Sequence, residues 1–375
     1  SAKVSTFSRG VTFVSSGESG TQANEFEAAI KSITSSTTVG AVFLYDTRND
    51  SDSGAWRKKA RGSWYYENLN TATRGGRREF PSVALIVADN PDSGNKTVTI
   101  YDLDDVAAPM WMVFNCGTDN FASNATFISC AVTGANSNDI NSIAAINGRL
   151  VVGGAVNGLV EIDFTTEQQT NFRPDVSATA VLRHKKSGRI ADRNDTSGQV
   201  LVAGTPIANA AVNDVAATVL EGAEIGALGL PIPTVGVACD SGLSIIHPNG
   251  DVYDIAGSGH TNDDIQKVFF TDDAMVGYGF EASGPVAHPW AVALRKIPFA
   301  NENITGWDNA ANLERYMPVV GGNTTGLTTN TDAYTSSDTT VNGVTPTGKN
   351  GLAIGYGDRL SIVKRNPEHM EQGAV

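Results

Sequence analysis

Three segments of the chain repeat one pattern: Val151-Val-Gly-Gly-Ala-Val-Asn-Gly-Leu-Val-Glu-Ile162, Val235-Gly-Val-Ala-Cys-Asp-Ser-Gly-Leu-Ser-Ile-Ile246 and Leu352-Ala-Ile-Gly-Tyr-Gly-Asp-Arg-Leu-Ser-Ile-Val363. Each is an apolar strand, a tight polar turn and a second strand that begins with Leu, which predicts a β-hairpin. A Gly precedes the Leu in the first two copies, and Arg359 does so in the third, at a place where the turn needs a residue with positive φ.

The spacing of these hairpins favours a β-propeller. The first two copies lie 84 residues apart, from Gly158 to Gly242, which is twice the roughly 42 residues of a four-stranded propeller blade. The third copy follows after 117 residues, so the repeat contains insertions. We predict one all-β propeller domain over residues 1–375 with seven blades, and a β-sandwich built from the same hairpins is the alternative.

The propeller prediction also places individual strands. The first strands of the three hairpins are small and apolar, and we expect them nearest the propeller axis. The strands between Leu243 and Val276 are expected to form one blade. We expect Val11–Val14 to pair with the last hairpin and close the ring, because too little chain follows that hairpin for a full blade.

Three stretches depart from the strand pattern. Residues 23–33 have apolar positions spaced four and three apart, which predicts a short helix. Residues 208–230, rich in Ala and Val, predict a second short helix. Residues 321–349 are dominated by Gly, Thr, Ser and Asn, which predicts a long insertion loop of the kind that often carries contacts.

The composition excludes several classes of protein. The 375 residues include 27 Lys and Arg against 40 Asp and Glu, a formal charge of −13, so we expect no nucleic-acid partner. The longest apolar run, Val83–Ala88, is too short to cross a membrane, and we expect no membrane insertion. Cys116, Cys130 and Cys239 have no metal-ligand spacing; we expect them reduced and mostly buried, with no metal and no cofactor.

Residues 55–80 concentrate aromatic and basic side chains in an otherwise acidic chain. Six of them are our candidates for a binding surface: Trp56, Trp64, Tyr66, Arg74, Arg77 and Arg78. Interleaved rings and cations suit stacking on sugars or bases, or the capture of an acidic partner surface. The alternative is that Trp64 and Tyr66 are core residues on alternate strand positions, with the basic residues paired to acidic neighbours in an oligomer contact.

No catalytic residues can be assigned from motifs. The chain has no Gly-x-Ser-x-Gly, and His247 and His260 lie beside turns, where we expect surface residues. Asp50-Ser-Asp-Ser-Gly-Ala-Trp56 is similar to the Asp-box turn of sialidase-like propellers, which is a structural turn. We therefore expect that the protein is not an enzyme.

One block of sequence resembles a known class of protein. Ser63–Ala88, with Val98–Asp102 and Pro109–Phe114 after it, resembles a block in structural proteins of tailed bacteriophages, particularly marine ones, and Leu230–Val252 resembles the same proteins. Together with the last hairpin, the resemblance covers 87 of 375 residues. It implies a tail-fibre or virion-surface component, a class in which a propeller-like region often precedes a lectin domain; we find no lectin domain here.

The resemblance implies a function but no catalytic site. The expected protein is a non-enzymatic virion structural protein, a tail-fibre or tail-associated component that supports host attachment and assembles as a homo-oligomer or with other virion proteins. A carbohydrate-binding propeller that contacts host-surface glycan through residues 56–78 or 321–349 stays open, as does a glycan hydrolase. Arg74, Arg77 and Arg78 are expected to contact an acidic patch on a neighbouring subunit.

Overall fold

The computed structural model describes the backbone over most of the chain. The described residues are 4–7, 11–14, 38–91, 96–116, 128, 139–174, 181–185, 188–195, 199–257, 264–271, 274–280, 290–304, 313–318, 341–346, 351–356 and 359–364. In these ranges the chain folds almost entirely into strands and turns, as the many short apolar runs bounded by Gly, Asn and Asp predict.

The strands form six sheets. Strands β1 (Val4–Phe7) and β2 (Val11–Val14) pair with each other, and β3 (Val39–Asp46), β4 (Val83–Asp89), β5 (Thr97–Asp102) and β6 (Met110–Asn115) form a four-stranded meander. The next sheet has six strands: β7 (Ile140–Ile146), β8 (Arg149–Gly154), β9 (Gly158–Asp163), β10 (Gln168–Arg173), β11 (Val181–Lys185) and β12 (Gln199–Ala203).

The C-terminal half adds three sheets. One contains β13 (Val212–Thr218), β14 (Thr234–Cys239), β15 (Gly242–Ile246), β16 (Val252–Gly257) and, in parallel pairing, β20 (Glu302–Ile304). The next contains β17 (Ile265–Phe270), β18 (Met275–Phe280), β19 (Trp290–Lys296) and β21 (Leu313–Pro318). The last contains β22 (Val341–Pro346), β23 (Gly351–Tyr356) and β24 (Arg359–Lys364).

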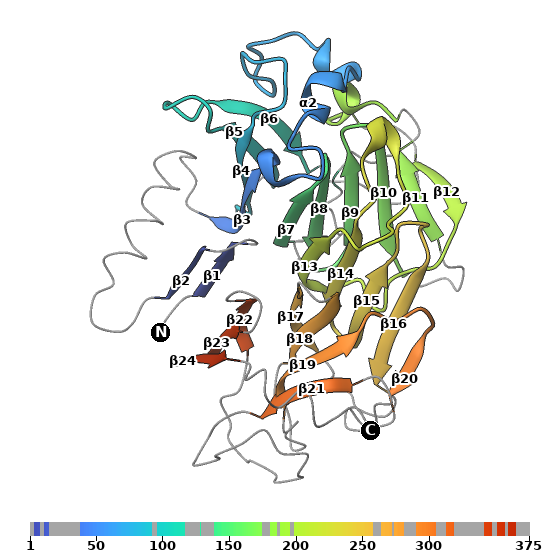
Figure 1. Cartoon of the computed structure of the whole chain (residues 1–375). Coiled ribbons are helices and arrows are strands. Elements are labelled where there is room, and N and C mark those ends of the chain that lie inside the picture. The colour runs from blue at the N-terminus through green and yellow to red at the C-terminus, as the bar shows by residue number, and fades with distance from the viewer. Residues whose placement is uncertain are drawn as a thin grey trace.

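The six sheets follow one another in a ring, as Figure 1 shows. The first strands of successive sheets contact each other in the order β3, β7, β13, β17 and β22, and β1 contacts both β22 and β3. A ring of meandering antiparallel sheets is a β-propeller, and a two-layer sandwich does not have this order of contacts. The all-β propeller fold is confirmed, whereas the predicted count of seven blades is not.

Three details of the predicted topology are wrong. The three hairpins form with the predicted strands, but β8, β14 and β23 are the second strands of their sheets, and β7, β13 and β22 lie inside them. The strands between Leu243 and Val276 are divided between two sheets, with the boundary after β16. Strand β2 pairs only with β1, and it is β1 that contacts the last sheet.

The helix and loop predictions also need correction. Residues 208–230 contain strand β13 and only a short 3-10 turn, η4 (Ala227–Gly229), because their Val and Ala residues pair with β14. Val341–Pro346, inside the stretch expected to be a loop, is strand β22. The helix predicted at 23–33 and the rest of residues 321–349 lie outside the described residues, as does Cys130.

The core lies between neighbouring sheets. One cluster of buried side chains joins the sheets of β3–β6, β7–β12 and β13–β16, and a second joins the sheets of β13–β16 and β17–β21. Close packing requires small residues: a Cβ on Gly153 would lie 2.6 Å from Val212 Cγ1 of the next sheet. Cys116 and Cys239 are buried free thiols, as predicted.

The remaining helical segments are short. They are η1 (Thr47–Asn49), α2 (Trp56–Lys59), η2 (Ser63–Tyr65) and η3 (Ile190–Asp192). Among the described residues, no helix is long and apolar enough to cross a membrane. Three of these four segments belong to the connection between β3 and β4, which is therefore the largest departure from the propeller meander in the described chain.

Candidate functional site

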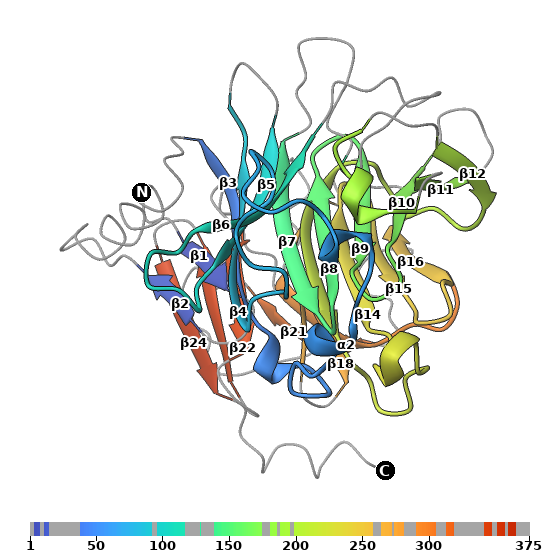
Figure 2. The same ribbon diagram turned by 90° about the horizontal axis from the view of Figure 1, so that it is seen from above.

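The connection between β3 and β4, residues 47–82, forms a compact cap, a name we keep for it. It contains η1, α2 and η2 and lies at one end of the strands, beside the turns of the next sheet (Figures 1 and 2). The cap includes all six residues that the sequence suggested as a binding surface. Its internal contacts decide which of them are available to a partner.

Asp50 anchors the start of the cap. Its carboxylate accepts hydrogen bonds from Tyr45 Oη (2.6 Å), Trp56 Nε1 (2.7 Å) and the Asn147 backbone N (2.8 Å). Burial raises the pKa of Asp50, although the three hydrogen bonds act to lower it. Burial also raises the pKa of Tyr45 well above its usual value. The Asp-box-like turn therefore serves to fasten the cap to the β7–β8 turn.

A cluster of aromatic rings forms the base of the cap. Trp64 donates from Nε1 to the Phe164 carbonyl oxygen (3.1 Å), and its ring centroid lies 5.6 Å from that of Trp111. Phe80 contacts Trp111 and Phe164 at 4.7 and 5.1 Å between ring centroids. The tilted and edge-on ring pairs are favourable geometries. The tryptophans thus join two sheets instead of facing solvent.

A carboxylate from the neighbouring sheet fixes η2. Glu167, in the β9–β10 turn, accepts hydrogen bonds from the backbone N (2.6 Å) and the hydroxyl of Ser63. Ser63 Oγ in turn accepts from the Ala191 backbone N of η3 (3.0 Å). A side-chain oxygen at the start of a helical turn satisfies donors that have no helical partner.

Two buried arginines share one carboxylate below the cap surface. Arg193 Nη1 donates to both oxygens of Glu67 at 2.8 Å, and Arg74 Nε lies 3.8 Å from the same group. Arg74 also donates to the carbonyl oxygens of Trp111 and Arg78 (2.9 Å each) and stacks 4.4 Å from the Trp111 ring. Desolvation lowers the pKa of Arg74 to about 10, so it remains a cation at neutral pH.

Arg77 is also used inside the chain. Its Nη1 lies 2.6 Å from an oxygen of Asp104 and 3.1 Å from both oxygens of Asp102. Asp104 accepts further hydrogen bonds from Ser82 and from the Val83 backbone N. Although partial burial opposes it, these bonds and the Arg77 cation lower the pKa of Asp104 to about 2.

The outer edge of the cap is basic and aromatic, and we call it the cap rim. Tyr66 is 68% exposed and meets Tyr65 edge-on, with 5.3 Å between ring centroids. Arg61 Cζ lies 4.1 Å from the Tyr65 ring, and Arg78 donates to the Tyr65 carbonyl oxygen (2.8 Å). Lys58 and Lys59 of α2 are exposed beside them.

The six predicted binding residues therefore separate into two groups. Trp56, Trp64 and Arg74 are fully buried and do not form the predicted surface. Arg77 is 35% exposed, but it is paired with two carboxylates of its own chain. Tyr66 and Arg78 remain on the cap rim. Trp64 and Tyr66 are not on a strand, because η2 occupies this position.

A histidine prediction is also wrong. His247 is buried rather than exposed, and its Nε2 lies 2.8 Å from the Pro298 carbonyl oxygen. His260 lies outside the described residues. The turn motif at His247 gave no sign of this burial, because the covering residues come from a segment about 50 positions away in the chain.

A second surface element is the β13–β14 loop, residues 219–233. Its tip is closed by hydrogen bonds from Gly226 N to Leu230 O (2.7 Å) and from Ile232 N to Glu224 O (2.8 Å). At this tip Ile225 is 62% and Leu228 is 36% exposed. Leu228 has a φ of 58°, a left-handed conformation that is costly for a leucine and often marks a functional position.

The cap and the β13–β14 loop lie side by side. Asn147 Nδ2 donates both to Ser51 Oγ in the cap (3.0 Å) and to the Pro231 carbonyl oxygen at the base of the loop (2.8 Å). Both views place α2 and this loop at the same end of the propeller (Figures 1 and 2). We call this end, formed by the cap and the turns beside it, the loop face.

Several loops of the loop face each expose an apolar side chain. Among the described residues, six large hydrophobic side chains are exposed, and five are in its loops: Tyr66, Val106, Ile225, Leu228 and Phe299. Phe299 belongs to this end because its ring lies 4.7 Å from that of His247 in the β15–β16 turn. Exposed apolar groups rimmed by charge are characteristic of interaction surfaces.

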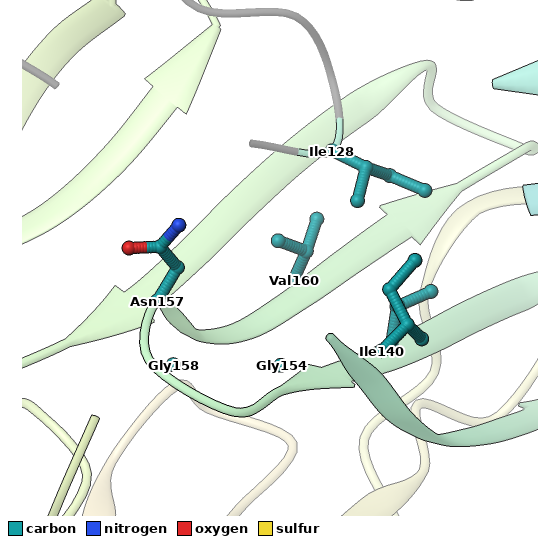
Figure 3. A pocket seen from close by; sticks show the side chains of 7 residues that line it. Ile128, Ile140, Gly154, Asn157, Gly158 and Val160 are labelled. Carbon is teal, nitrogen blue, oxygen red and sulfur yellow. The ribbon is translucent and has the colours of Figure 1, made fainter. Parts of the chain in front are cut away.

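A small cavity lies away from the loop face. It is enclosed by apolar side chains of the second sheet and by Ile128, with Asn157 at the β8–β9 turn (Figure 3). Its free space fits about one water molecule, whereas small-molecule sites usually have volumes of at least about 300 Å³. The cavity is therefore a packing defect and not a ligand site.

Comparisons with known proteins give distant structural neighbours. No protein-family model matches the chain, and no curated protein is similar to it in sequence. The WD40 β-propeller domain of Doa1 is 11% identical over 76% of this chain and 90% of that chain, with a TM-score of 0.32. The extracellular domain of the putative one component system BT4673 from B. thetaiotaomicron is 10% identical over 76% and 40%, with a TM-score of 0.27.

A designed protein is similarly distant. The computationally designed Ika8 protein is 12% identical over 74% of this chain and 93% of its own, with a TM-score of 0.25. The assignment of the propeller fold rests on the ring of sheets and their inter-strand contacts.

Proposed function

We propose that the protein is a non-enzymatic structural component of a tailed-bacteriophage virion, a tail-fibre or tail-associated propeller that supports host attachment. The observation that carries the proposal is the loop face, on which exposed apolar side chains and the basic cap rim are held by loops closed by hydrogen bonds. A preformed surface loses little conformational entropy on binding, which suits a part of a permanent assembly. The resemblance of Ser63–Ala88 and Leu230–Val252 to phage structural proteins supports a tailed-phage virion as the assembly.

The test is the composition of the particle. Mass spectrometry of phage particles purified by density gradient should detect this chain at a fixed number of copies per particle, and antibody labelling should locate it on the tail. A chain that is synthesised in infected cells but absent from purified particles overturns the proposal.

A second candidate function is carbohydrate binding by the cap rim. The exposed ring of Tyr66, beside the stacked pair of Arg61 and Tyr65, suits stacking on a sugar ring. A glycan array should then show binding that the Tyr66→Ser variant loses and the Tyr66→Phe variant keeps. Release of sugar products from host polysaccharide would favour a hydrolase instead.

A further inference from the structure

We propose that the loop face docks on the loop face of a second copy of this chain, with the β13–β14 loop of each copy seated against the cap rim of the other. The inference rests on the proposed structural function and names the partner. It starts from the chemistry of two neighbouring surfaces on one face.

The cap rim is the basic surface of an acidic chain. Residues 55–80 hold seven basic and two acidic side chains, a net charge of +5 in a chain of formal charge −13. Ion pairs within the chain use part of this charge. Arg74 faces Glu67, and Arg77 is paired with Asp102 and Asp104. Arg61 lies 3.8 Å from Glu79, and Lys59 lies 4.0 Å from Asp52. Lys58 and Arg78 are exposed and form no ion pair in the described chain, and Lys59 and Arg61 keep exposed side chains at long ion pairs.

The β13–β14 loop has the opposite character. Glu221 and Glu224 are exposed on either side of a short turn, and Ile225 and Leu228 project from its tip. Residues 219–233 contain no Lys or Arg. The loop therefore offers an apolar knob with acidic neighbours, and the cap rim offers an aromatic surface with basic neighbours.

The two surfaces do not satisfy each other within one copy. In the described chain, no ion pair joins Glu221 or Glu224 to the cap. Asn147 links the two surfaces by hydrogen bonds, and Leu230 of the loop is buried in the same cluster as Trp56 of the cap. The complementary charges of the two surfaces are thus available to another molecule.

A two-fold axis satisfies both surfaces at once. When two loop faces meet about such an axis, the loop of the first copy contacts the cap of the second, and the reverse contact forms by symmetry. Each contact pairs carboxylates with cations and buries Ile225 and Leu228 against Tyr66. Charge complementarity of this kind fixes orientation and discriminates against wrong partners. The strained backbone of Leu228 is explained by this contact, because the turn displays an apolar side chain where Gly would be easier.

The test is charge reversal followed by mixing. Sedimentation equilibrium of the whole chain should show a dimer at micromolar concentration. The loop variant Glu221→Lys/Glu224→Lys and the cap variant Lys58→Glu/Lys59→Glu should each raise the dimer Kd at least about tenfold. An equimolar mixture of the two variants should restore the dimer, because each reversed surface then meets its complement.

The controls separate electrostatics from misfolding. The conservative variants Glu221→Asp/Glu224→Asp and Lys58→Arg/Lys59→Arg should keep the dimer. Ile225→Ser should dissociate it, whereas Leu44→Ser, at an exposed leucine on β3, should not. Measured by urea below the dimer Kd, the free energy of unfolding of each variant should lie within about 0.5 kcal/mol of the wild type, because the changes are on the surface. The exception is Lys58→Glu/Lys59→Glu, which also breaks the Lys59–Asp52 ion pair and should cost up to about 1 kcal/mol.

Several outcomes overturn the inference. The first is a wild-type chain that is still monomeric at about 100 µM, an order-of-magnitude upper limit for a useful interface. The second is a dimer whose Kd neither charge reversal changes. The others are a mixture of the two variants that stays monomeric, and open polymers in place of dimers. Binding of a glycan to the cap rim by a monomeric chain also overturns it and supports the second candidate function. A chain found in particles but monomeric overturns this inference alone, whereas a dimer absent from particles overturns the proposed function alone.

Discussion

The cap and the β13–β14 loop lie side by side but are stabilised in different ways. The cap is fixed by hydrogen bonds of its side chains to the neighbouring sheet and its turns. Asp50 accepts from Asn147 N, Trp64 donates to Phe164 O, and Glu67 accepts from Arg193, which follows η3. The loop tip is closed by its own backbone hydrogen bonds, with Leu230 buried beneath it and Ile225 and Leu228 exposed. A segment rich in aromatic and basic residues is thus mostly interior, and an inconspicuous segment carries exposed apolar side chains.

This difference has an energetic basis. Tryptophan and arginine have large apolar surfaces, and a cap of 36 residues without its own sheet needs such surfaces to remain folded on its neighbours. The β13–β14 loop is short and closed by backbone hydrogen bonds, and one buried side chain, Leu230, fixes it on the core. The loop can therefore expose Ile225 and Leu228 without losing its conformation.

The largest effect should follow from removing the cap's anchor. Asp50→Ala leaves Tyr45 Oη, Trp56 Nε1 and the Asn147 backbone N buried without their acceptor. Each lost partner costs about 1–3 kcal/mol, so we expect about 4 kcal/mol of destabilisation. Urea unfolding followed by tryptophan fluorescence measures it.

The matched control for this variant is Asp105→Ala. Asp105 lies on the exposed β5–β6 turn, where its side chain accepts one hydrogen bond, from Ala107 N. The expected change is within about 0.5 kcal/mol. Similar losses for the two variants would show that the Asp50 network is not the anchor of the cap.

The next largest loss of stability should distinguish the buried Arg74 from Arg78 of the cap rim. Arg74→Met removes a cation that holds two carbonyl oxygens and faces Glu67, and we expect a loss of about 3 kcal/mol. Arg78→Met removes one exposed hydrogen bond to Tyr65 O and should cost less than about 1 kcal/mol. Equal losses in urea unfolding would contradict this division of the segment.

The sequence predicted the fold better than the site. Alternation and turn residues predicted the strands of the hairpins and of the β3–β6 sheet, and the repeated hairpin predicted the propeller, because these signals depend on local backbone preferences. Strands such as β7, β10 and β21 were not predicted, and β13 and β22 were expected to be helix and loop. The sequence did not predict that the hairpins form the second and third strands of their sheets. The inner strands that precede them, β7 and β13, have no distinctive pattern of apolar residues. Gly158 and Gly242 both have positive φ, 77° and 152°, as the Gly before each Leu predicts. In the middle copy it is Ser241, with a φ of 77°, that takes the left-handed position.

The site residues were harder to predict because burial depends on distant partners. Nothing near Trp64 in the sequence indicates Phe164, one hundred residues away, as its hydrogen-bond acceptor. The pair Arg74 and Glu67 is closer in sequence, but its burial depends on Arg193 and Trp111. The exposed loop was missed because residues 219–233 contain Ala, Gly and Pro with few charges, a composition that suggests core or helix.

A smaller effect should appear in acid. The pKa of Asp104 is about 2 in the folded protein and about 4 in unfolded chains. Because the folded value is lower, Asp104 stabilises the cap fully above pH 4, and this contribution is lost as the pH falls toward 2.

Asp104→Asn should reduce that acid-dependent loss. The variant should be less stable than the wild type by at most about 1 kcal/mol above pH 4, since solvent partly screens the group, and the difference should disappear toward pH 2. Urea midpoints measured from pH 2 to pH 6 give the difference between variant and wild type. A difference that does not change over this range would show that Asp104 and Arg77 do not couple stability to pH.

The smallest effect on stability should accompany a large effect on assembly. At Leu228, whose φ is 58°, Gly removes the strain of a left-handed leucine, worth about 1–2 kcal/mol. Gly also makes the unfolded chain more flexible, which returns about 0.5–1 kcal/mol. Leu228→Gly should therefore leave the free energy of unfolding between unchanged and about 1 kcal/mol higher.

If the β13–β14 loop docks on a second copy, the same variant should weaken the dimer, because the side chain that it removes contributes to the contact. Stability unchanged with the dimer lost would show that the sequence keeps a strained leucine for assembly. A dimer retained at wild-type affinity would instead reduce Leu228 to a surface residue with no part in the contact.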